Sequence, residues 1–240
     1  MNVVHLARLP APRALFDGGH RIGCARLSFN SRPTRDRTKR GCSLLKGKRL
    51  MAVNIIEETA DVLMEYEKIP IAFRVESRFR AELCEKGLGG IKLVEEPVTP
   101  FIKDYDGFET EKPAQWSKRW DISSWGIISA FEGEKRIGGA AVAWNTPGIL
   151  MLEDRPDLAC LWDLRVHPDF RQQGIGKRLF ARALEWARQR QCRRFKVETQ
   201  NINVPACRFY AAQGCELGAI NRYAYDEELD EIQLLWYRNL

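Results

Sequence analysis

A glycine-containing run of polar residues gives this 240-residue chain its clearest chemical signal. The run is Arg171-Gln172-Gln173-Gly174-Ile175-Gly176-Lys177, and a helical pattern of apolar residues follows it from Leu179. A helix that begins at these glycines leaves its first backbone N–H groups without partners, and glycine lets a ligand approach the backbone closely. Free N–H groups at a helix start attract anions, so the run predicts a site for a phosphate or pyrophosphate group.

Two common phosphate-binding patterns do not fit this run. A P-loop requires G-x-x-x-x-G-K-[ST], but Arg171 stands at its first glycine and Arg178 at its Ser/Thr position. The dinucleotide fingerprint G-x-G-x-x-G fails as well, because Leu179 occupies the place of the third glycine. The pattern that remains is [QR]-x-x-G-x-[GA], which Arg171, Gly174 and Gly176 satisfy.

The segments on either side of the run are the ones that such a site requires. An apolar segment at 159–166 precedes it and predicts a strand that ends before Pro168. After the run, apolar residues recur at the spacing of one buried helical stripe: Leu179, Phe180, Ala183, Leu184, Trp186 and Ala187. Strand, glycine loop and helix together predict that the free N–H groups lie at the end of the strand.

A second informative stretch spans residues 198–215 and contains the letters E-T-Q-x-x-N-x-x-A-C-x-F-Y. Asn203 predicts a helix N-cap, and Pro205 suits the first turn of that helix. The residues that then share one helical face are Ala206, Phe209, Tyr210 and Gln213. Gly214 predicts the end of the helix.

Together the two motifs resemble the acetyl-CoA signature of the GNAT superfamily of N-acetyltransferases and its companion pattern N-x-x-A-x-x-[FL]-Y. The resemblance covers residues 125–238, and its second motif looks most like streptothricin acetyltransferases and their uncharacterised relatives. The sequence departs from the family pattern at Cys215, where the family usually has phenylalanine. The difference removes one aromatic ring from the core and no reactive group. The implied activity is acetyl-CoA-dependent transfer of an acetyl group to a primary amine of a small molecule, such as a streptothricin-like antibiotic, by direct attack.

The resemblance also implies which residues bind the acetyl donor. The loop amides would hold the pyrophosphate of coenzyme A, and the second helix would flank the pantetheine arm. The implied cofactor-binding residues are Leu164, Arg165, Val166, Arg171, Gln172, Gln173, Gly174, Ile175, Gly176, Lys177, Asn203, Ala206 and Phe209. Acetyl-CoA is the expected donor, and no metal ion is expected.

Transfer to an amine requires a base and an acid. An alkylammonium, with a pKa of about 10.4, must lose a proton before it can attack a thioester. Asp163 and Glu198 are the candidate bases, since each points away from the apolar neighbours on its strand. The alternative for each is a salt bridge, with Arg165 or Lys196 as the partner. Tyr210 is the candidate acid for the departing thiolate, and the alternative is that it serves only the core.

The order of the other predicted elements agrees with the fold that the resemblance implies. We expect a short helix at 57–66, a strand at 69–75 and a helix at 76–86. The later strands and helix are expected at 125–131, 136–144, 194–199, 204–213 (helix), 217–225 and 232–238. The expected fold class is α/β (α+β), the GNAT acyl-CoA N-acyltransferase fold, with a mixed, mostly antiparallel twisted sheet flanked by helices.

Charge is distributed unevenly along the chain. Residues 1–50 hold 12 of the 38 Lys and Arg residues and 2 of the 32 acidic residues, so they carry +10 while the remainder carries −4. We expect a basic leader at 1–50, either disordered or a gene-model extension ahead of Met51, and a GNAT N-acetyltransferase domain at 51–240. An organelle transit peptide and an RNA-binding tail are the alternatives for the leader.

Composition narrows the compartment and the partners. The seven cysteines form no C-x-x-C pair, which argues against a zinc site, and their odd, scattered arrangement suits a reducing, cytoplasmic compartment. No apolar stretch reaches the length of a membrane span. We expect a small-molecule amine substrate, no nucleic-acid partner for 51–240 and no membrane partner, and a homodimer stays open. Acetylation of a protein or peptide amine, or a non-catalytic acyl-CoA-binding regulator, are the alternative functions.

Overall fold

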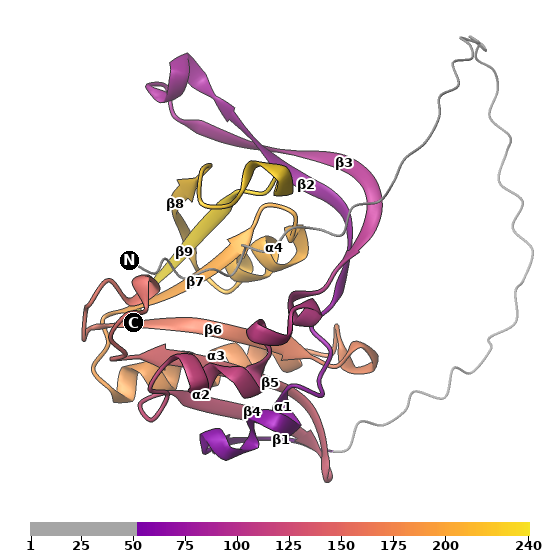
Figure 1. Ribbon diagram of the computed structural model, residues 1–240, viewed down its shortest axis with the longest axis vertical. Coiled ribbons are helices and arrows are strands. Elements are labelled where there is room, and N and C mark those ends of the chain that lie inside the picture. The colour runs from indigo at the N-terminus through magenta and orange to yellow at the C-terminus, as the bar shows by residue number, and fades with distance from the viewer. Residues whose placement is uncertain (1–51) are drawn as a thin grey trace, which may run out of the picture. The chain divides into compact units, whose positions relative to one another are not determined.

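The computed structural model describes residues 52–240, which form a seven-stranded sheet with helices on both faces (Figure 1). In spatial order the strands are β1 (Val53–Glu58), β4 (Gly126–Glu132), β5 (Lys135–Trp144), β6 (Leu158–Val166), β7 (Arg194–Gln200), β9 (Gln233–Asn239) and β8 (Glu216–Asn221). Neighbouring strands are antiparallel except β6 and β7, which are parallel. The expected mixed, mostly antiparallel sheet is confirmed, whereas the expectations for residues 1–50 lie outside the described residues.

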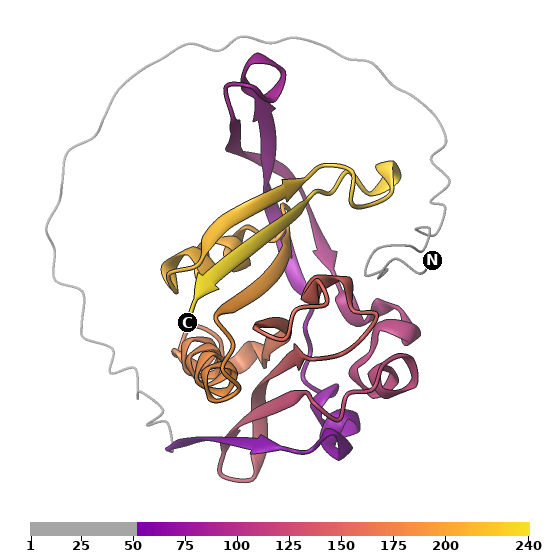
Figure 2. The same cartoon turned by 90° about the vertical axis from the view of Figure 1, so that its left-hand side faces the viewer.

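The helices cover the two faces of the sheet in pairs (Figure 2). On one face lie α3 (Ile175–Gln189) and α4 (Val204–Ala212), and on the other lie α1 (Leu63–Tyr66) and α2 (Trp116–Arg119). Along β5, Ala140 and Val142 contact the α3 side while Ala141 and Ala143 contact the α1 side. Successive side chains of a strand point to opposite faces, so this run of small apolar residues is buried on both.

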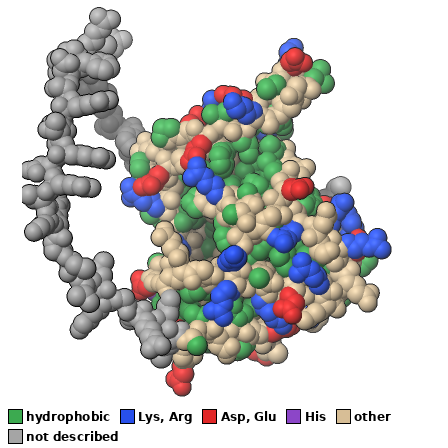
Figure 3. Space-filling model, turned by 180° about the vertical axis from the view of Figure 1, so that it is seen from behind, with side chains coloured by type: hydrophobic (Ala, Val, Ile, Leu, Met, Phe, Trp, Pro, Cys, Tyr) green, Lys and Arg blue, Asp and Glu red, His purple; other side chains and the backbone are tan. Residues whose placement is uncertain are grey.

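The apolar stripe predicted for the first helix is buried along α3. Lys177, Arg178 and Arg188 lie on its exposed side. Seen from behind, the lower half of the molecule carries Lys and Arg side chains that are spread out and interspersed with acidic ones (Figure 3). The helix is therefore amphipathic, with its apolar side holding it against the sheet.

Two glycines allow aromatic side chains to lie directly on the sheet. A Cβ atom at Gly139 would come within 2.2 Å of the Tyr66 ring, and one at Gly126 within 2.4 Å of the Trp186 ring. Contacts this short do not occur between real side chains, so neither position can take a larger residue without moving α1 or α3. Glycine at these positions sets the distance between the sheet and both helices.

A separate two-stranded sheet interrupts the expected order of elements. It consists of β2 (Phe73–Leu83) and β3 (Ile91–Lys103), which extend away from the main sheet (Figure 1). The prediction of a helix at 76–86 is therefore wrong, and the strand predicted at 69–75 begins only at Phe73. Residues 73–83 alternate between apolar and charged side chains, and Arg78 and Arg80 pair with Glu96 across the hairpin. This cross-strand pairing outweighs the helix propensity of Glu, Arg, Ala and Leu.

The remaining predicted elements are placed correctly, with shifts at their ends. A short helix was expected at 57–66, but β1 occupies residues 53–58. Only the last turn of the expected helix is α-helical, as α1. The strands β4 and β5 form the expected hairpin, and β8 and β9 form the expected last pair. Gly214 has a φ of +78°, which confirms its role in ending α4.

The strands β6 and β7 diverge after their first few residues. Their pairing ends at Leu161 and Val197, and beyond that point β6 is bonded only to β5, while β7 is bonded to β9. Trp162 lies in a bulge, because Asp163 pairs with Ala141 and Leu161 with the next residue of β5. A bulge bends a strand locally, and here it coincides with the start of the divergence.

Candidate active site

A cavity of about 650 Å³ lies where β6 and β7 diverge. Most of the predicted site residues line it: Asp163, Leu164, Arg165, Val166, Arg171, Gln172, Gly174, Ile175, Gly176, Lys177, Glu198, Asn203, Ala206, Phe209 and Tyr210. The exception is Gln173, whose side-chain amide donates instead to the Asp169 carbonyl at 3.2 Å. The structure therefore brings together residues that the sequence placed in two separate motifs.

The glycine loop fits an anionic ligand. Gln172 and Gly174 have φ values of +61° and +80°, and the first backbone bond of the helix joins Arg178 N to Gly174 O at 3.1 Å. Within residues 52–240 the N–H groups from Gln172 to Lys177 donate to no other group. Free N–H groups in this arrangement, with the Lys177 charge beside them, provide the donors that a pyrophosphate requires.

Arg171 supports the loop through its side chain. Its guanidinium donates to the backbone carbonyls of Val166 at 3.0 Å, Ala72 at 3.1 Å and Pro70 at 3.5 Å. These contacts connect the loop to the end of β6 and to the segment that leads into β2. Arg171 thus adds positive charge to this end of the cavity while its hydrogen bonds go to the protein backbone.

The N-terminus of α4 has the cap that the second motif predicts. The Asn203 side-chain oxygen accepts a hydrogen bond from Ala206 N at 3.2 Å, and Pro205 stands in the first turn. The cap turns the Ala206 and Phe209 face of the helix toward the cavity. This confirms the local structure, and the proposed contacts of these residues with the acetyl donor stay a prediction.

Tyr210 lies between aromatic rings at the edge of the cavity. Its ring is 5.1 Å from that of Phe209 and 5.6 Å from that of Phe180, and the residue is only 7% exposed. Burial, helped by the negative charge of Asp163, raises the pKa of Tyr210 above its ordinary value. Its hydroxyl makes no hydrogen bond within residues 52–240, so it is a protonated donor available to a ligand.

Asp163 has the salt bridge that the sequence left open as the alternative. Arg165 donates to both of its carboxylate oxygens, at 2.9 and 2.6 Å, and the Tyr66 hydroxyl donates at 2.6 Å. The Arg165 guanidinium also contacts Asp106 at 2.7 Å and the Ile69 carbonyl at 3.0 Å. Asp163 is therefore fixed in a buried network, and the Arg165 side chain is directed into it, which leaves the Arg165 backbone to contact a ligand.

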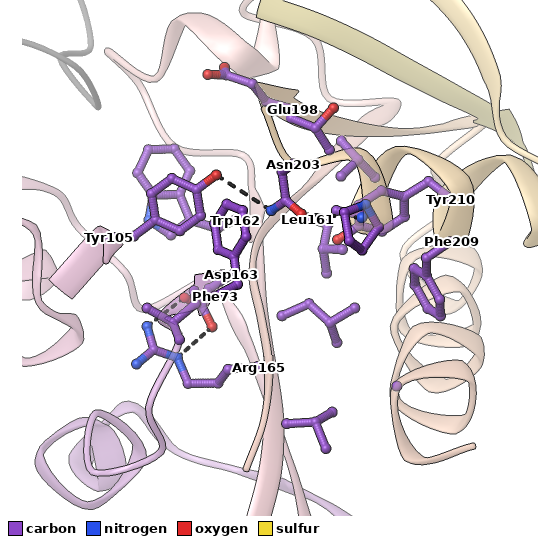
Figure 4. Close-up of a pocket in the computed structure, with 18 of the residues that line it drawn as sticks. Phe73, Tyr105, Leu161, Trp162, Asp163, Arg165, Glu198, Asn203, Phe209 and Tyr210 are labelled. Atoms are coloured by element: carbon purple, nitrogen blue, oxygen red, sulfur yellow. Dashed lines mark hydrogen bonds and ion pairs between the residues drawn. The ribbon is translucent and has the colours of Figure 1, made fainter. Parts of the chain in front are cut away.

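Glu198 has no cationic partner within salt-bridge distance among the described residues, because Lys196 pairs with Glu153 at 2.7 Å. Its carboxylate accepts hydrogen bonds from Tyr225 at 2.7 Å and Gln233 at 2.8 Å. Burial raises the pKa of Glu198, and these two hydrogen bonds partly offset that effect. Glu198 and Tyr210 lie across the cavity from Asp163 and Arg165 (Figure 4).

The cavity also has aromatic and polar lining residues that the sequence analysis did not predict as site residues. Its lining includes Phe73, Tyr105, Glu111, Trp116, Trp162 and Gln200. Tyr105 follows β3 in a 3-10 turn (Tyr105–Gly107), and the hairpin that places it was not predicted. The aromatic and charged residues of this region give no regular spacing in the sequence, so only the structure reveals that they meet.

Among residues 52–240, no three His, Cys, Asp or Glu side chains are placed together so that they could hold a metal ion. No helix in the same part of the chain is both long and apolar enough to cross a membrane.

Comparisons with known proteins identify the family of the chain. The profile of the Acetyltransferase (GNAT) family matches residues 92–215. Streptothricin acetyltransferase A of Bacillus subtilis (strain 168) is 36% identical over 81 residues, which is 33% of this chain and 47% of that protein's length. Streptothricin acetyltransferase of Escherichia coli is 27% identical over 192 residues, covering 78% of this chain and 95% of the relative.

Solved structures show the same fold. A Bacillus anthracis str. Ames protein, named as a candidate streptothricin acetyltransferase and solved with acetyl coenzyme A, superimposes with a TM-score of 0.62 at 25% identity. That similarity covers 80% of this chain and 99% of the other. Nourseothricin acetyltransferase gives a TM-score of 0.60 at 22% identity, over 79% of this chain and 99% of the other.

Proposed function

Because the chain belongs to the acetyltransferase (GNAT) family, we propose that it transfers the acetyl group of acetyl-CoA to a primary amine of a small molecule, within the domain at 51–240. The N-acetyltransferase class inferred from the two motifs is confirmed by the family match. Bound acetyl-CoA would supply an acetyl group activated as a thioester. The loop from Gln172 to Lys177 would hold its pyrophosphate, and the free edge of β6 together with α4 would flank its pantetheine arm.

The observation that carries this proposal is the composition of the cavity. One end has free N–H groups and the charges of Arg171 and Lys177, which suit an anionic donor. The lining also combines aromatic rings with Glu198, a carboxylate free of any ion pair in the described chain. An aromatic and acidic wall favours a positively charged amine as the acceptor.

The chain's own residues would move two protons. We assign Glu198 as the base that accepts a proton from the acceptor ammonium, directly or through water, in preference to Asp163. Asp163 is a weaker candidate because Arg165 and Tyr66 already occupy its oxygens. Tyr210 would donate its hydroxyl proton to the sulfur that leaves, which fits a tyrosine whose raised pKa keeps it protonated.

For the acceptor, we propose an amine of a streptothricin-type antibiotic. The similarity to streptothricin acetyltransferases over most of the described chain supports this choice over a protein amine. The test is the release of free thiol from acetyl-CoA by the full-length protein with a streptothricin, a simple diamine and a peptide with a free N-terminus. Thiol release with the antibiotic alone is the expected result, and preferential acetylation of the peptide would overturn the choice of acceptor.

The loop assignment predicts the effect of a charge at Gly176. Replacing Gly176 by Asp is expected to weaken acetyl-CoA binding roughly tenfold or more, because a carboxylate would repel the pyrophosphate. A Cβ atom there lies 3.7 Å from Phe209, an ordinary contact, and Asp in a first helical turn does not harm a helix. Calorimetric titration with acetyl-CoA measures the affinity, and Gly176→Asn is the control of equal size. Equal affinities of the Asp and Asn variants would remove the pyrophosphate from this loop.

A further inference from the structure

A chain of hydrogen bonds connects Glu198 to the N-terminus of α4. It runs from Ala206 N to Asn203 Oδ1 (3.2 Å), from Asn203 Nδ2 to Tyr105 Oη (3.5 Å), from Tyr105 Oη to Gln200 Oε1, from Gln200 Nε2 to Tyr225 Oη (2.8 Å) and from Tyr225 Oη to Glu198 Oε1 (2.7 Å). The second carboxylate oxygen accepts from Gln233 at 2.8 Å, and Gln200 Nε2 also donates directly to Glu198 Oε1 over a longer distance of 3.5 Å. Tyr225 and Gln233 do not line the cavity, so they contact Glu198 without being placed to touch a ligand.

Both ends of the chain fix the direction of its bonds. An ionised carboxylate only accepts, so Tyr225 must donate to Glu198 and its oxygen must accept from the Gln200 amide N–H. At the other end, Asn203 must turn its oxygen to the backbone N–H of Ala206, which leaves its NH₂ group to face Tyr105. The two requirements meet at the Tyr105 hydroxyl, which accepts from Asn203 and donates to Gln200. One orientation of every group satisfies the whole chain.

This direction favours the ionised form of Glu198. A proton on either carboxylate oxygen would face the hydrogen of a donor. That donor is Tyr225 at one oxygen and Gln233 at the other. Tyr225 cannot simply reverse, because Gln200 donates to its oxygen and is itself held by Tyr105. Protonation of Glu198 would therefore weaken at least one of its two short hydrogen bonds, and a reversal would have to extend to the helix cap.

Few other ionisable groups act on Glu198. On its own strand, Lys196 lowers its pKa slightly, and that ammonium is already paired with Glu153. From β6 the Cys160 thiol faces it, and burial raises the pKa of that thiol to about 12, so the thiol stays neutral. From the segment after β3 the Tyr105 hydroxyl faces it, and burial keeps this group protonated too. Burial is thus the main influence on the pKa of Glu198, and its two hydrogen-bond donors Tyr225 and Gln233 are the main groups that oppose it.

We propose that Tyr225 and Gln233 are positioning residues that keep Glu198 ionised and oriented toward the cavity, and that Gln200 and Tyr105 lock Tyr225 in the donating direction. This inference rests on the proposed function, because it assumes that Glu198 is the base. It assigns a role to the connection between β8 and β9, which carries Tyr225 and lies outside both sequence motifs. Tyr105, which lines the cavity, is part of the same chain of hydrogen bonds.

The pKa of Glu198 can be measured in the full-length protein without any substrate. Glutamate labelled with ¹³C at its carboxyl carbon gives a pH titration by NMR, and the signal that Glu198→Gln removes identifies the residue. In Tyr225→Phe and in Gln233→Met the pKa of Glu198 is expected to rise by about one unit, since each loses a charge-assisted hydrogen bond. Tyr105→Phe should give a smaller rise, and Tyr223→Phe, which changes an exposed tyrosine, should give none.

The same variants are then compared in acetyl transfer. The acidic limb of kcat/KM should move to higher pH by the amount that NMR records, while acetyl-CoA affinity stays near wild type. The melting temperature of Tyr225→Phe and of Gln233→Met should fall by a few degrees, because each variant loses a hydrogen bond to a buried carboxylate. An unmoved pKa of Glu198 in both Tyr225→Phe and Gln233→Met would overturn the positioning role. If the pKa of Glu198 measured by NMR moves but the acidic limb of kcat/KM stays in place, Glu198 is not the base. A wild-type protein that acetylates no amine would overturn the proposed function alone.

Discussion

Tyr210→Phe is expected to lower turnover by at least about a hundredfold while acetyl-CoA affinity and melting temperature stay close to wild type. General acid catalysis contributes roughly 10²- to 10⁴-fold to a rate, and the substitution removes only the hydroxyl that would protonate the departing sulfur. The ring and its contacts with Phe180 and Phe209 remain. No hydrogen bond within the described residues is lost, so the folded state should not be weakened.

Tyr66→Phe is the matched control for this prediction. The Tyr66 side chain is also buried near Asp163, but its hydroxyl donates to that carboxylate at 2.6 Å. Its loss should cost about 1.5–3 kcal/mol in the free energy of unfolding and leave turnover largely intact. Single-turnover measurements on a confirmed acceptor separate chemistry from product release. Wild-type single-turnover rates in Tyr210→Phe would return this tyrosine to a packing role.

Glu198→Gln is expected to reduce kcat/KM by roughly 10²- to 10⁴-fold at neutral pH and to abolish the acidic limb of its pH profile. The base acts when ionised, so wild-type activity should fall as the pH drops through the pKa of Glu198. Burial raises that pKa, which places the limb above the pH at which an ordinary glutamate titrates. In the variant, the residual rate should rise with pH as more of the acceptor amine becomes neutral.

Asp163→Asn distinguishes the two carboxylates that the sequence proposed as bases. It breaks a buried ion pair with Arg165, which should cost about 3 kcal/mol in the free energy of unfolding. Enzyme that remains folded should keep the acidic limb, because Glu198 is unchanged. The reverse pattern, with the limb lost in Asp163→Asn and kept in Glu198→Gln, would assign the base to Asp163.

The glycine loop, α3 and α4 could be predicted from the sequence because their causes are local. The φ values at Gly174 and Gly214, the cap by Asn203 and the apolar stripe of α3 all arise among residues within a turn or two of one another. The two motifs were therefore sufficient to identify the family and to predict the loop that we propose for the acetyl donor. The hairpin β2–β3 was missed because its stabilising contacts are cross-strand pairs, which residue preferences do not report.

The states of the ionisable residues were decided only by the tertiary structure. The sequence offered Asp163 and Glu198 as equivalent carboxylates, each with an arginine or lysine close by. Folding gave Asp163 its arginine and a tyrosine 97 residues away, whereas Glu198 received two uncharged donors, one from the connection between β8 and β9 and one from β9. The energy of a buried charge depends on every group within a few ångströms, and those groups come from segments whose separation in the chain has no regular pattern. The sequence by itself therefore determined the family and the local elements, while the partners of the two carboxylates depended on the fold.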